Sequence, residues 1–258
     1  MAPEEATLET REVRARAWRA GRGRLVVFLH GAAGVPPWNP FFDALAQHYD
    51  VLVPEHPGFG ATPSPPWLRN VGDMAMYYLD ALDALAGERV HLVGNSLGGW
   101  IAAELAVRNC SRLASLSLIS PAGVRVKGVP MGDSFIWSSQ ETVRNLYHDQ
   151  ALAERLLAEP PSEEQAELIL VNRFAAAKLG WEPRWHNPAL ERWLHRISVP
   201  TLVLWGAQDK FLPARYADAW TAQIPDARVE LIAECGHLPH MEKPELAARK
   251  LLNFIGSR

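Results

Sequence analysis

The sequence predicts an α/β fold, in which a mostly parallel sheet of roughly eight strands has helices on both faces. Short runs of consecutive apolar residues alternate along the chain with longer segments of helical pattern. Because most of these runs are apolar at every position, they are typical of strands that helices cover on both sides. The alternation stops at residues 121–199, so we expect a core formed by residues 1–120 and 200–258, with a helical cap inserted between its two parts.

The predicted strands differ in how much of each lies against the core. Residues 10–18 alternate between polar and apolar side chains, which indicates a half-buried strand near the edge of the sheet. The runs that follow are short and apolar, as expected for the middle of a sheet. These inner strands are predicted at residues 25–29, 51–53, 90–93, 113–119 and 202–205, with a last strand at 229–232.

Helical patterns lie between the strands and in the insertion. The helices of the core are predicted at residues 39–48, 73–85, 97–108, 213–223 and 244–255. Within the insertion, Ser162 precedes Glu163 and Glu164, and a serine followed by acidic residues is typical of the first turn of a helix. We therefore expect a helix to begin there.

Composition and charge exclude several classes of partner. Hydrophobic residues make up 48% of the 258 residues and charged residues 21%, as in a globular protein. The net charge of −3 gives no broad basic field that would attract nucleic acid or a membrane surface. No run reaches the ~18 apolar residues that span a bilayer, and the first twenty residues are too charged for a signal peptide. With Cys110 and Cys235 far apart, we expect a cytoplasmic protein.

One apolar run ends in a glycine-rich turn that carries a candidate nucleophile. The turn contains Gly94, Ser96 and Gly98, and a predicted helix begins directly after the serine. So sharp a turn strains the backbone at Ser96, and only glycine neighbours let the chain pass closely enough. The Ser96 hydroxyl is therefore expected at the carboxyl end of the sheet. It would also lie at a helix N-terminus, where negative charge is stabilised.

A serine nucleophile needs a base and a third group that orients the base. Asp209 follows the predicted strand at residues 202–205, and His237 follows the last strand in the same way. Both side chains should therefore lie at the carboxyl edge of the sheet, near Ser96. His240 is closer to the final helix, so we assign it a structural role, and the remaining histidines receive no catalytic role.

Acyl transfer also requires hydrogen-bond donors for the oxyanion. One predicted donor is the backbone N–H of Leu97, which directly follows the nucleophile. The second should come from the loop after the strand at residues 25–29, where Gly31 to Gly34 form a turn of small residues. We favour the N–H of Ala32, with that of Ala33 as the alternative.

Together these motifs resemble the α/β-hydrolase superfamily over nearly the whole chain outside the insertion. The resemblance implies the α/β-hydrolase fold, a Ser-Asp-His triad in that chain order and a strained nucleophile turn. It implies no metal and no organic cofactor. The matching elements are His30-Gly31, Pro57-Gly58-Phe59-Gly60, the Ser96 turn, Trp205-Gly206 with Asp209, and Gly236-His237 with Glu242 and Pro244.

Some branches of the superfamily fit the residues better than others. Haloalkane dehalogenases and epoxide hydrolases place an aspartate where this chain has Ser96, which argues against both. The chain is similar to small capped serine esterases and to the carbon–carbon bond hydrolases of aromatic ring-fission products. In the latter, a tryptophan commonly follows the catalytic histidine and the oxyanion loop is rich in glycine. This chain has Leu238 at the first position and Ala32 and Ala33 in the loop.

These features predict hydrolysis of carboxylic esters with small to medium, apolar acyl groups, with the ester and water as the reacting partners. The alternatives are hydrolysis of a carbon–carbon, amide or lactone bond, and a ligand-binding relative without turnover. The cap is expected to cover the site and select the substrate. Some aromatic residues could line the pocket or pack cap against core: Trp38, Phe135, Trp137, Trp181 and Trp185.

Overall fold

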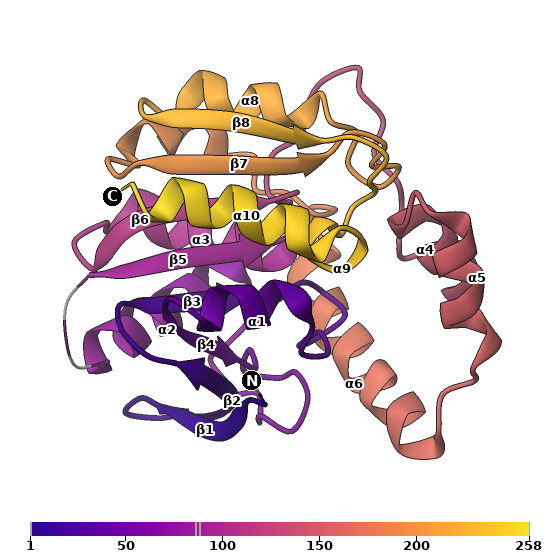
Figure 1. Cartoon of the computed structure of the whole chain (residues 1–258), viewed down its shortest axis with the longest axis horizontal. Coiled ribbons are helices and arrows are strands. Elements are labelled where there is room, and N and C mark those ends of the chain that lie inside the picture. The colour runs from indigo at the N-terminus through magenta and orange to yellow at the C-terminus, as the bar shows by residue number, and fades with distance from the viewer. Residues whose placement is uncertain (1, 86, 88, 258) are drawn as a thin grey trace.

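A computed structural model describes residues 2–85, 87 and 89–257 of the chain. Its strands are β1 (Glu4–Glu9), β2 (Arg14–Gly21), β3 (Leu25–Leu29), β4 (Asp50–Pro54), β5 (Val90–Asn95), β6 (Leu113–Ile119), β7 (Thr201–Gly206) and β8 (Ala227–Ile232). In this part of the chain they form one eight-stranded sheet in the order β1-β2-β4-β3-β5-β6-β7-β8 (Figure 1). β1 and β2 pair antiparallel, as do β2 and β4, and all other pairs are parallel. The predicted, mostly parallel α/β sheet is confirmed.

The first edge of the sheet differs from the prediction. The strand expected at residues 10–18 instead begins at Arg14, and Thr10 donates its backbone N–H to the carbonyl of Val13 in a turn at 2.9 Å. β1 was not predicted, because charged residues dominate it and Leu8 is its one buried residue. Backbone pairing with β2 holds this strand, and such pairing leaves no apolar run in the sequence.

The helices of the core lie close to their predicted positions. Two of them are shorter than expected: the helix predicted at residues 39–48 spans Pro40–Ala46, and the one predicted at 213–223 begins only at Tyr216. The core helices are α1 (Pro40–Ala46), α2 (Val71–Ala84), α3 (Leu97–Arg108), α8 (Tyr216–Gln223), α9 (Pro239–Glu242) and α10 (Pro244–Ile255). No helix among the described residues is both long enough and apolar enough to cross a bilayer.

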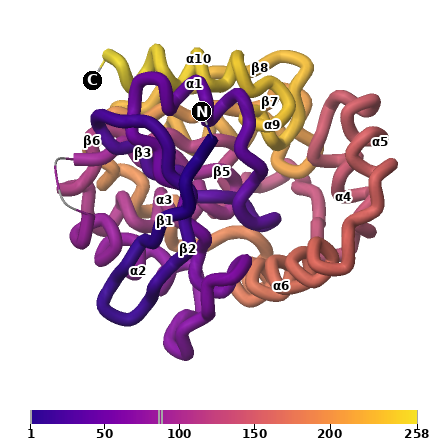
Figure 2. Tube along the Cα trace, turned by 60° about the horizontal axis from the view of Figure 1, so that its bottom comes forward, coloured from indigo at the N-terminus to yellow at the C-terminus, as the bar shows by residue number. Residues whose placement is uncertain are grey.

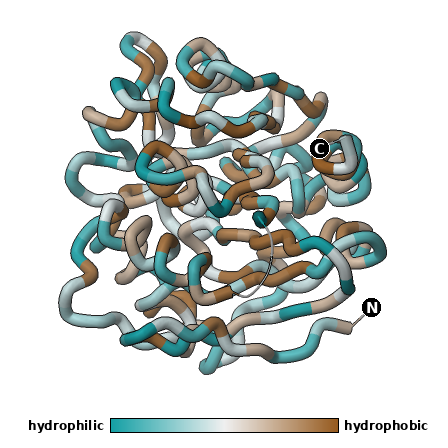
Figure 3. Tube along the Cα trace, turned by 90° about the vertical axis from the view of Figure 1, so that its left-hand side faces the viewer, coloured by the Kyte–Doolittle hydropathy of each residue, from teal (hydrophilic) through white to brown (hydrophobic). Residues whose placement is uncertain are grey.

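Apolar cores lie on both faces of the sheet. Phe41 of α1 and Phe254 of α10 are buried on one face. Ile101 of α3 and Trp220 of α8 are buried on the other, together with the apolar side of α2. Figure 3 shows apolar segments through the middle of the molecule and polar segments mainly at its periphery. The inner strands are therefore covered on both sides, which explains why their sequences are apolar at consecutive positions.

The segment between β6 and β7 is helical. Its elements are α4 (Ser139–Leu146), α5 (Gln150–Ala158), α6 (Glu163–Gly180), α7 (Leu190–Trp193) and a short 3-10 helix, η1 (Leu194–Arg196). α6 begins directly after Ser162, as predicted, and the Ser162 hydroxyl accepts a hydrogen bond from the N–H of Gln165. The arrowheads of β7 and β8 point toward the side on which α4, α5 and α6 lie, and Figure 2 shows these helices from a second direction (Figures 1 and 2).

Candidate active site

Ser96 lies in a strained turn between β5 and α3. Its backbone has φ 52° and ψ −113°, in a region that non-glycine residues rarely occupy. Gly98 makes the turn possible, because any side chain there would overlap the backbone carbonyls of Leu29 and His30. The backbone carbonyl of Ser96 accepts hydrogen bonds from the N–H groups of Trp100 and Ala122, at 3.0 and 3.1 Å. The serine is thus rigidly held, with 7% of its surface exposed.

Ser96, His237 and Asp209 are brought together by three different loops. His237 Nε2 lies 2.9 Å from Ser96 Oγ, and His237 Nδ1 lies 2.7 Å from Asp209 Oδ2. Because a carboxylate oxygen can only accept, Nδ1 carries the proton and Nε2 is free to accept the serine hydroxyl. The order nucleophile, base, orienting acid is the one that serine hydrolases use.

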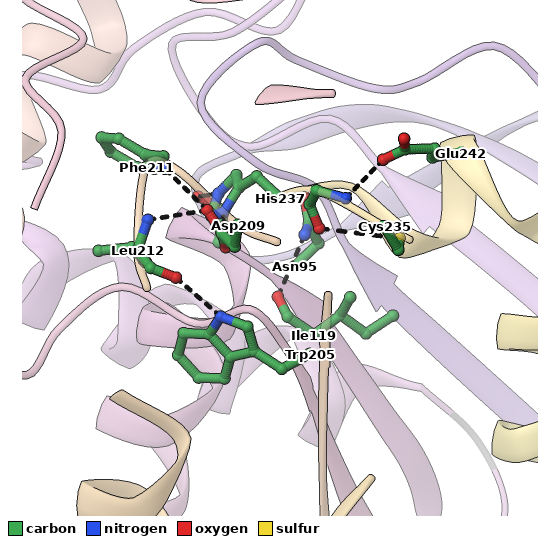
Figure 4. A network of polar contacts seen from close by, with 11 residues as sticks. Asn95, Ile119, Trp205, Asp209, Phe211, Leu212, Cys235, His237 and Glu242 are labelled. Atoms are coloured by element: carbon green, nitrogen blue, oxygen red, sulfur yellow. Dashed lines mark hydrogen bonds and ion pairs between the residues drawn. The ribbon is translucent and has the colours of Figure 1, made fainter. Parts of the chain in front are cut away.

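The Asp209 carboxylate is fixed by its own loop. Its Oδ1 accepts hydrogen bonds from the backbone N–H groups of Phe211 and Leu212, both at 2.8 Å (Figure 4). The carbonyl of Leu212 in turn accepts from the indole N–H of Trp205 at 2.9 Å. These bonds occupy one carboxylate oxygen and leave Oδ2 directed at His237, so the imidazole has a single favoured orientation.

The predicted oxyanion donors belong to the Ser96 turn and to the loop that contains Gly31. The N–H groups of Leu97 and Ala32 have no hydrogen-bond partner among the residues that the structure describes. The loop of Ala32 is close to the nucleophile, because a Cβ placed on Gly31 would lie 3.5 Å from the Cβ of Ser96. Two uncommitted N–H groups beside a nucleophile are suited to bind an oxyanion. The assignment of this role to Leu97 and Ala32 remains a prediction.

His30 and His56, two buried histidines for which the sequence predicted no catalytic role, hold the Ala32 loop. His56 donates from its backbone N–H to His30 Nε2 at 3.0 Å and from its Nε2 to the His30 carbonyl at 2.9 Å. His30 Nδ1 donates to the Gly31 carbonyl at 2.7 Å, and the Tyr78 hydroxyl donates to His56 Nδ1 at 2.6 Å. Burial lowers the pKa of His30 to about 4, so its ring is neutral at pH 7 and keeps this hydrogen-bond pattern.

The loop of His237 is held by the helical insertion and by Glu242. The backbone N–H of His237 donates to the carbonyl of Leu146, at the end of α4, at 2.7 Å. One Glu242 oxygen accepts from the N–H of Gly236 at 2.6 Å (Figure 4). Its other oxygen accepts from the N–H of Asp149 at 2.6 Å. The sequence motif marked Glu242, but nothing in the sequence indicated that it joins the histidine loop to α5.

The aromatic residues proposed as pocket walls fall into two groups. Trp38 stacks on Phe42 of α1, 5.1 Å between ring centroids, and so packs on the core. The others cluster around Phe211, whose ring lies edge-on to His237 at a centroid distance of 4.9 Å. Their contacts run from Phe211 to Trp137 and Trp185, and from Trp185 through Phe135 to Trp181. This group connects the insertion with the candidate catalytic histidine.

Comparison with known proteins identifies the family. Residues 24–244 match the family model described as alpha/beta hydrolase fold, and the chain belongs to this family. The resemblance that the sequence motifs indicated is therefore confirmed. The eight-stranded sheet and the position of the Ser96 turn after β5 agree with this fold.

Several of the proteins to which this chain is similar are hydrolases. The chain is 30% identical to the 2-hydroxy-6-oxo-6-phenylhexa-2,4-dienoate hydrolase of Comamonas testosteroni, over 93% of this chain and 90% of that protein. It is 25% identical to a thermophilic esterase from Thermogutta terrifontis, with a TM-score of 0.78 and 98% of each chain covered. A serine hydrolase involved in carbazole degradation shares the fold, with a TM-score of 0.80 over 100% of both chains at 24% identity. The chain is therefore a hydrolase of this family.

Proposed function

We propose that this chain cleaves carboxylic esters with small to medium, apolar acyl groups, using a serine nucleophile. The observation that carries the proposal is the hydrogen-bonded series of Ser96, His237 and Asp209. The unpartnered N–H groups of Leu97 and Ala32 support it, because they lie beside the nucleophile. A nucleophile, a base, an orienting acid and oxyanion donors are the groups that acyl transfer requires.

In the first half of the reaction, Ser96 Oγ forms a bond to the ester carbonyl carbon while His237 Nε2 takes the hydroxyl proton. The negative charge moves to the carbonyl oxygen, where the N–H groups of Leu97 and Ala32 stabilise it. When the tetrahedral intermediate collapses, the bond to the alkoxy oxygen breaks. His237 returns its proton to that oxygen, so the products are an acyl-enzyme and a free alcohol.

In the second half, water takes the place of the alcohol. His237 removes a proton from the water as its oxygen attacks the acyl carbon, and then returns the proton to Ser96 Oγ as the acyl bond breaks. The carboxylic acid leaves and the serine is restored. Throughout, Asp209 holds the Nδ1–H tautomer and stabilises the cationic form of the imidazole.

The helical insertion is proposed to act as a cap that selects the acyl group. Phe211 contacts the imidazole of His237 directly, and Trp137 and Trp185 of the insertion approach Phe211 at 6.0 and 6.2 Å between ring centroids. Aromatic walls next to the catalytic base favour an apolar acyl group, because apolar surface of the substrate is removed from water there.

We place the reaction in the cytoplasm, since Cys110 and Cys235 are free thiols. Cys235 lies two residues before His237 but does not compete with Ser96 as a nucleophile. Burial raises the pKa of the Cys235 thiol, and a neutral thiol is a poor nucleophile.

Hydrolysis of a carbon–carbon bond is the second candidate, and the 30% identity with the dienoate hydrolase of Comamonas testosteroni favours it. Ester hydrolysis is nevertheless favoured over carbon–carbon bond hydrolysis for two reasons. A carbon leaving group is far less stable than an alkoxide and needs its charge delocalised into the dienoate, whereas an alcohol needs only the proton that His237 carries. In addition, Leu238 follows His237, at the position where a tryptophan is common in such enzymes.

A panel of p-nitrophenyl esters from acetate to palmitate, assayed with wild-type protein and with Ser96→Ala, tests the proposal. We expect turnover by the wild type that falls by roughly 10⁴–10⁶-fold in Ser96→Ala and in His237→Ala. Asp209→Ala should lower kcat somewhat less, because the base remains in place. The acyl length with the highest kcat/KM reports the size of the acyl site.

The same proteins separate the proposed activity from its alternatives. If folded wild-type protein hydrolyses none of the esters, ester hydrolysis is wrong, and a yellow ring-fission dienoate is tested next. Loss of the yellow colour that requires Ser96 supports the carbon–carbon hydrolase. Tight ligand binding without any turnover supports a ligand-binding relative instead. If Ser96→Ala keeps most of the activity, Ser96 is not the nucleophile.

A further inference from the structure

The side chain of Asn172 joins the helical insertion to the loop that carries the predicted oxyanion donor. Asn172 belongs to α6 and is 6% exposed. Its Nδ2 donates to the backbone carbonyl of Ala33 at 2.9 Å, and its Oδ1 accepts from the backbone N–H of Gly60 at 2.9 Å. Both ends of the amide are therefore bound to backbone groups of the core, which are more than a hundred residues away in the chain.

The Ala33 carbonyl belongs to the tight turn that presents Ala32. The N–H of Gly34 closes this turn on the carbonyl of Gly31 at 3.2 Å, and the same carbonyl accepts from His30 Nδ1 at 2.7 Å. These two bonds set the plane of the Gly31–Ala32 peptide from its carbonyl side, so its N–H is directed the opposite way. Asn172 holds the next part of the turn, and together the contacts determine where the N–H of Ala32 points.

The fit between the amide and the turn is close. Gly34 has φ +96°, and a side chain there would overlap the amide of Asn172. Gly60, whose N–H binds the other end of the amide, has φ +56°. A Cβ at Gly34 would therefore displace the amide, whereas a Cβ at Gly60 would overlap the Glu55 carboxylate, and both positions have a φ that favours glycine.

Asn172 lies where α6 leaves the core. Preceding residues such as Leu168 and Leu170 are exposed at 45% and 67%, whereas Ala175, Ala176, Leu179 and Gly180 are buried. Asn172 is the first buried residue of the helix. A shift of the exposed half of α6 would therefore reach the Ala33 carbonyl through the side chain of Asn172.

We propose that Asn172 is a positioning residue that couples the placement of α6 to the alignment of the Ala32 N–H with the oxyanion. This inference rests on the proposed function of the Ser96 site, and it extends that function to the insertion. Without the amide, the turn keeps its internal hydrogen bond and the bond from His30 but loses the support at the Ala33 carbonyl. A donor displaced by a fraction of an ångström binds the developing charge more weakly, although the substrate itself still enters.

The substitutions Asn172→Leu and Asn172→Asp test this role. Leucine has a similar size without either hydrogen bond, whereas aspartate can still accept from Gly60 but places an oxygen against the Ala33 carbonyl. For both variants we expect kcat to fall by roughly 10–100-fold with KM within about 3-fold, somewhat less than removal of an oxyanion donor. Because aspartate keeps one bond, it provides a second folded variant if leucine destabilises the protein.

The affinity for phenylboronic acid distinguishes a positioning role from a structural one. Substitution of a residue that only stabilises the fold would leave this affinity unchanged. The boronate forms a tetrahedral adduct with the serine, and one of its oxygens occupies the position of the oxyanion. Its affinity should fall by about the same factor as kcat. If kcat and boronate affinity in both variants equal those of the wild type, the proposal is overturned. A fall in kcat with unchanged boronate affinity also overturns it.

Asn187→Leu is the matched control. Asn187 also anchors the insertion, through a 2.6 Å hydrogen bond to Glu104 of α3, and its hydrogen bonds among the described residues go to groups outside the Ala32 loop. This variant should lower Tm and leave kcat and boronate affinity within about 2-fold. If it lowers them as much as Asn172→Leu, loosening of the insertion in general is responsible, and the specific role of Asn172 is wrong.

Ester hydrolysis and the positioning role of Asn172 can be tested separately. Boronate affinity depends on the serine and the oxyanion donors, whichever bond the enzyme cleaves. A wild type that binds boronate without ester turnover contradicts only the ester activity, and Asn172 is then judged by affinity alone. A wild type that neither binds boronate nor hydrolyses any ester overturns both.

Discussion

Substitution of Glu242 by glutamine should loosen the loop that carries His237. The two oxygens of Glu242 accept the N–H groups of Gly236 and Asp149, each at 2.6 Å, and the side chain is 9% exposed. Glutamine has nearly the same shape but only one accepting atom. Its NH₂ group would face a backbone N–H, so one buried donor would lose its partner.

The expected loss follows from these contacts. A hydrogen bond to a charged group contributes about 1.5–3 kcal/mol, and an unpaired buried donor costs a further ~1–3 kcal/mol. Allowing for partial relaxation of the loop, we expect Glu242→Gln to lower the free energy of unfolding by about 2–4 kcal/mol. In a chain of this size, that corresponds to a fall in Tm of roughly 5–10 °C. Because Gly236 precedes His237, kcat should also fall by about 10-fold.

Thermal unfolding and ester turnover of purified Glu242→Gln measure both effects. Glu245→Gln is the control, since it makes the same chemical change at an exposed position in the first turn of α10. The control should change the free energy of unfolding by less than about 1 kcal/mol. If Glu242→Gln shifts Tm and kcat no more than Glu245→Gln does, the carboxylate does not hold the histidine loop and the argument is refuted.

Two further predictions concern buried histidines and the nucleophile turn. Burial lowers the pKa of His30 to about 4 and that of His240 to about 3, so the folded chain binds fewer protons than the unfolded chain below pH 6.5. Their contribution to stability is complete above pH 6.5 and falls by up to ~1.4 kcal/mol per histidine and pH unit toward pH 4. Urea midpoints at pH 7, 6 and 5 should therefore decrease, and less steeply in His240→Phe; an identical slope in that variant would contradict the assignment. Gly98→Ala should destabilise the protein by at least ~2 kcal/mol and abolish ester turnover, because its methyl group would overlap two backbone carbonyls. Gly128→Ala, at a positive φ but with open space around it, should cost only about 1 kcal/mol, and equal losses would refute the steric argument.

The inner strands could be predicted because a strand that is buried on both faces is apolar at consecutive positions. The run at residues 25–29 is apolar throughout, and the structure places β3 at the same residues, between β4 and β5. β1 contains no such apolar run. Leu8 is its one buried residue, and its other residues are mostly polar. Backbone pairing with β2 therefore makes it a strand. Strand propensity and hydrophobic pattern depend on side chains, whereas the pairing of an edge strand is made by backbone hydrogen bonds.

The candidate triad could be predicted because each of its members lies at the end of a strand. Parallel strands bring their carboxyl ends to one edge, so Ser96, Asp209 and His237 had to be near one another once the alternation of strands and helices was recognised. The strained turn at Ser96 also had a local signal, in the glycines on either side of it. Local sequence therefore specified which residues meet, and the topology specified where.

The supports of the site were decided only by the tertiary structure. Asn172, Glu242 and the pair of His30 and His56 bind backbone groups of loops that are distant in the chain. A backbone N–H or carbonyl is the same at every residue, so a side chain that binds one leaves no matching partner in the sequence. The sequence by itself determined the fold and the candidate reacting groups, because these depend on side-chain type and order. The alignment of those groups depends on contacts between side chains and distant backbone, and such contacts exist only once the chain has folded.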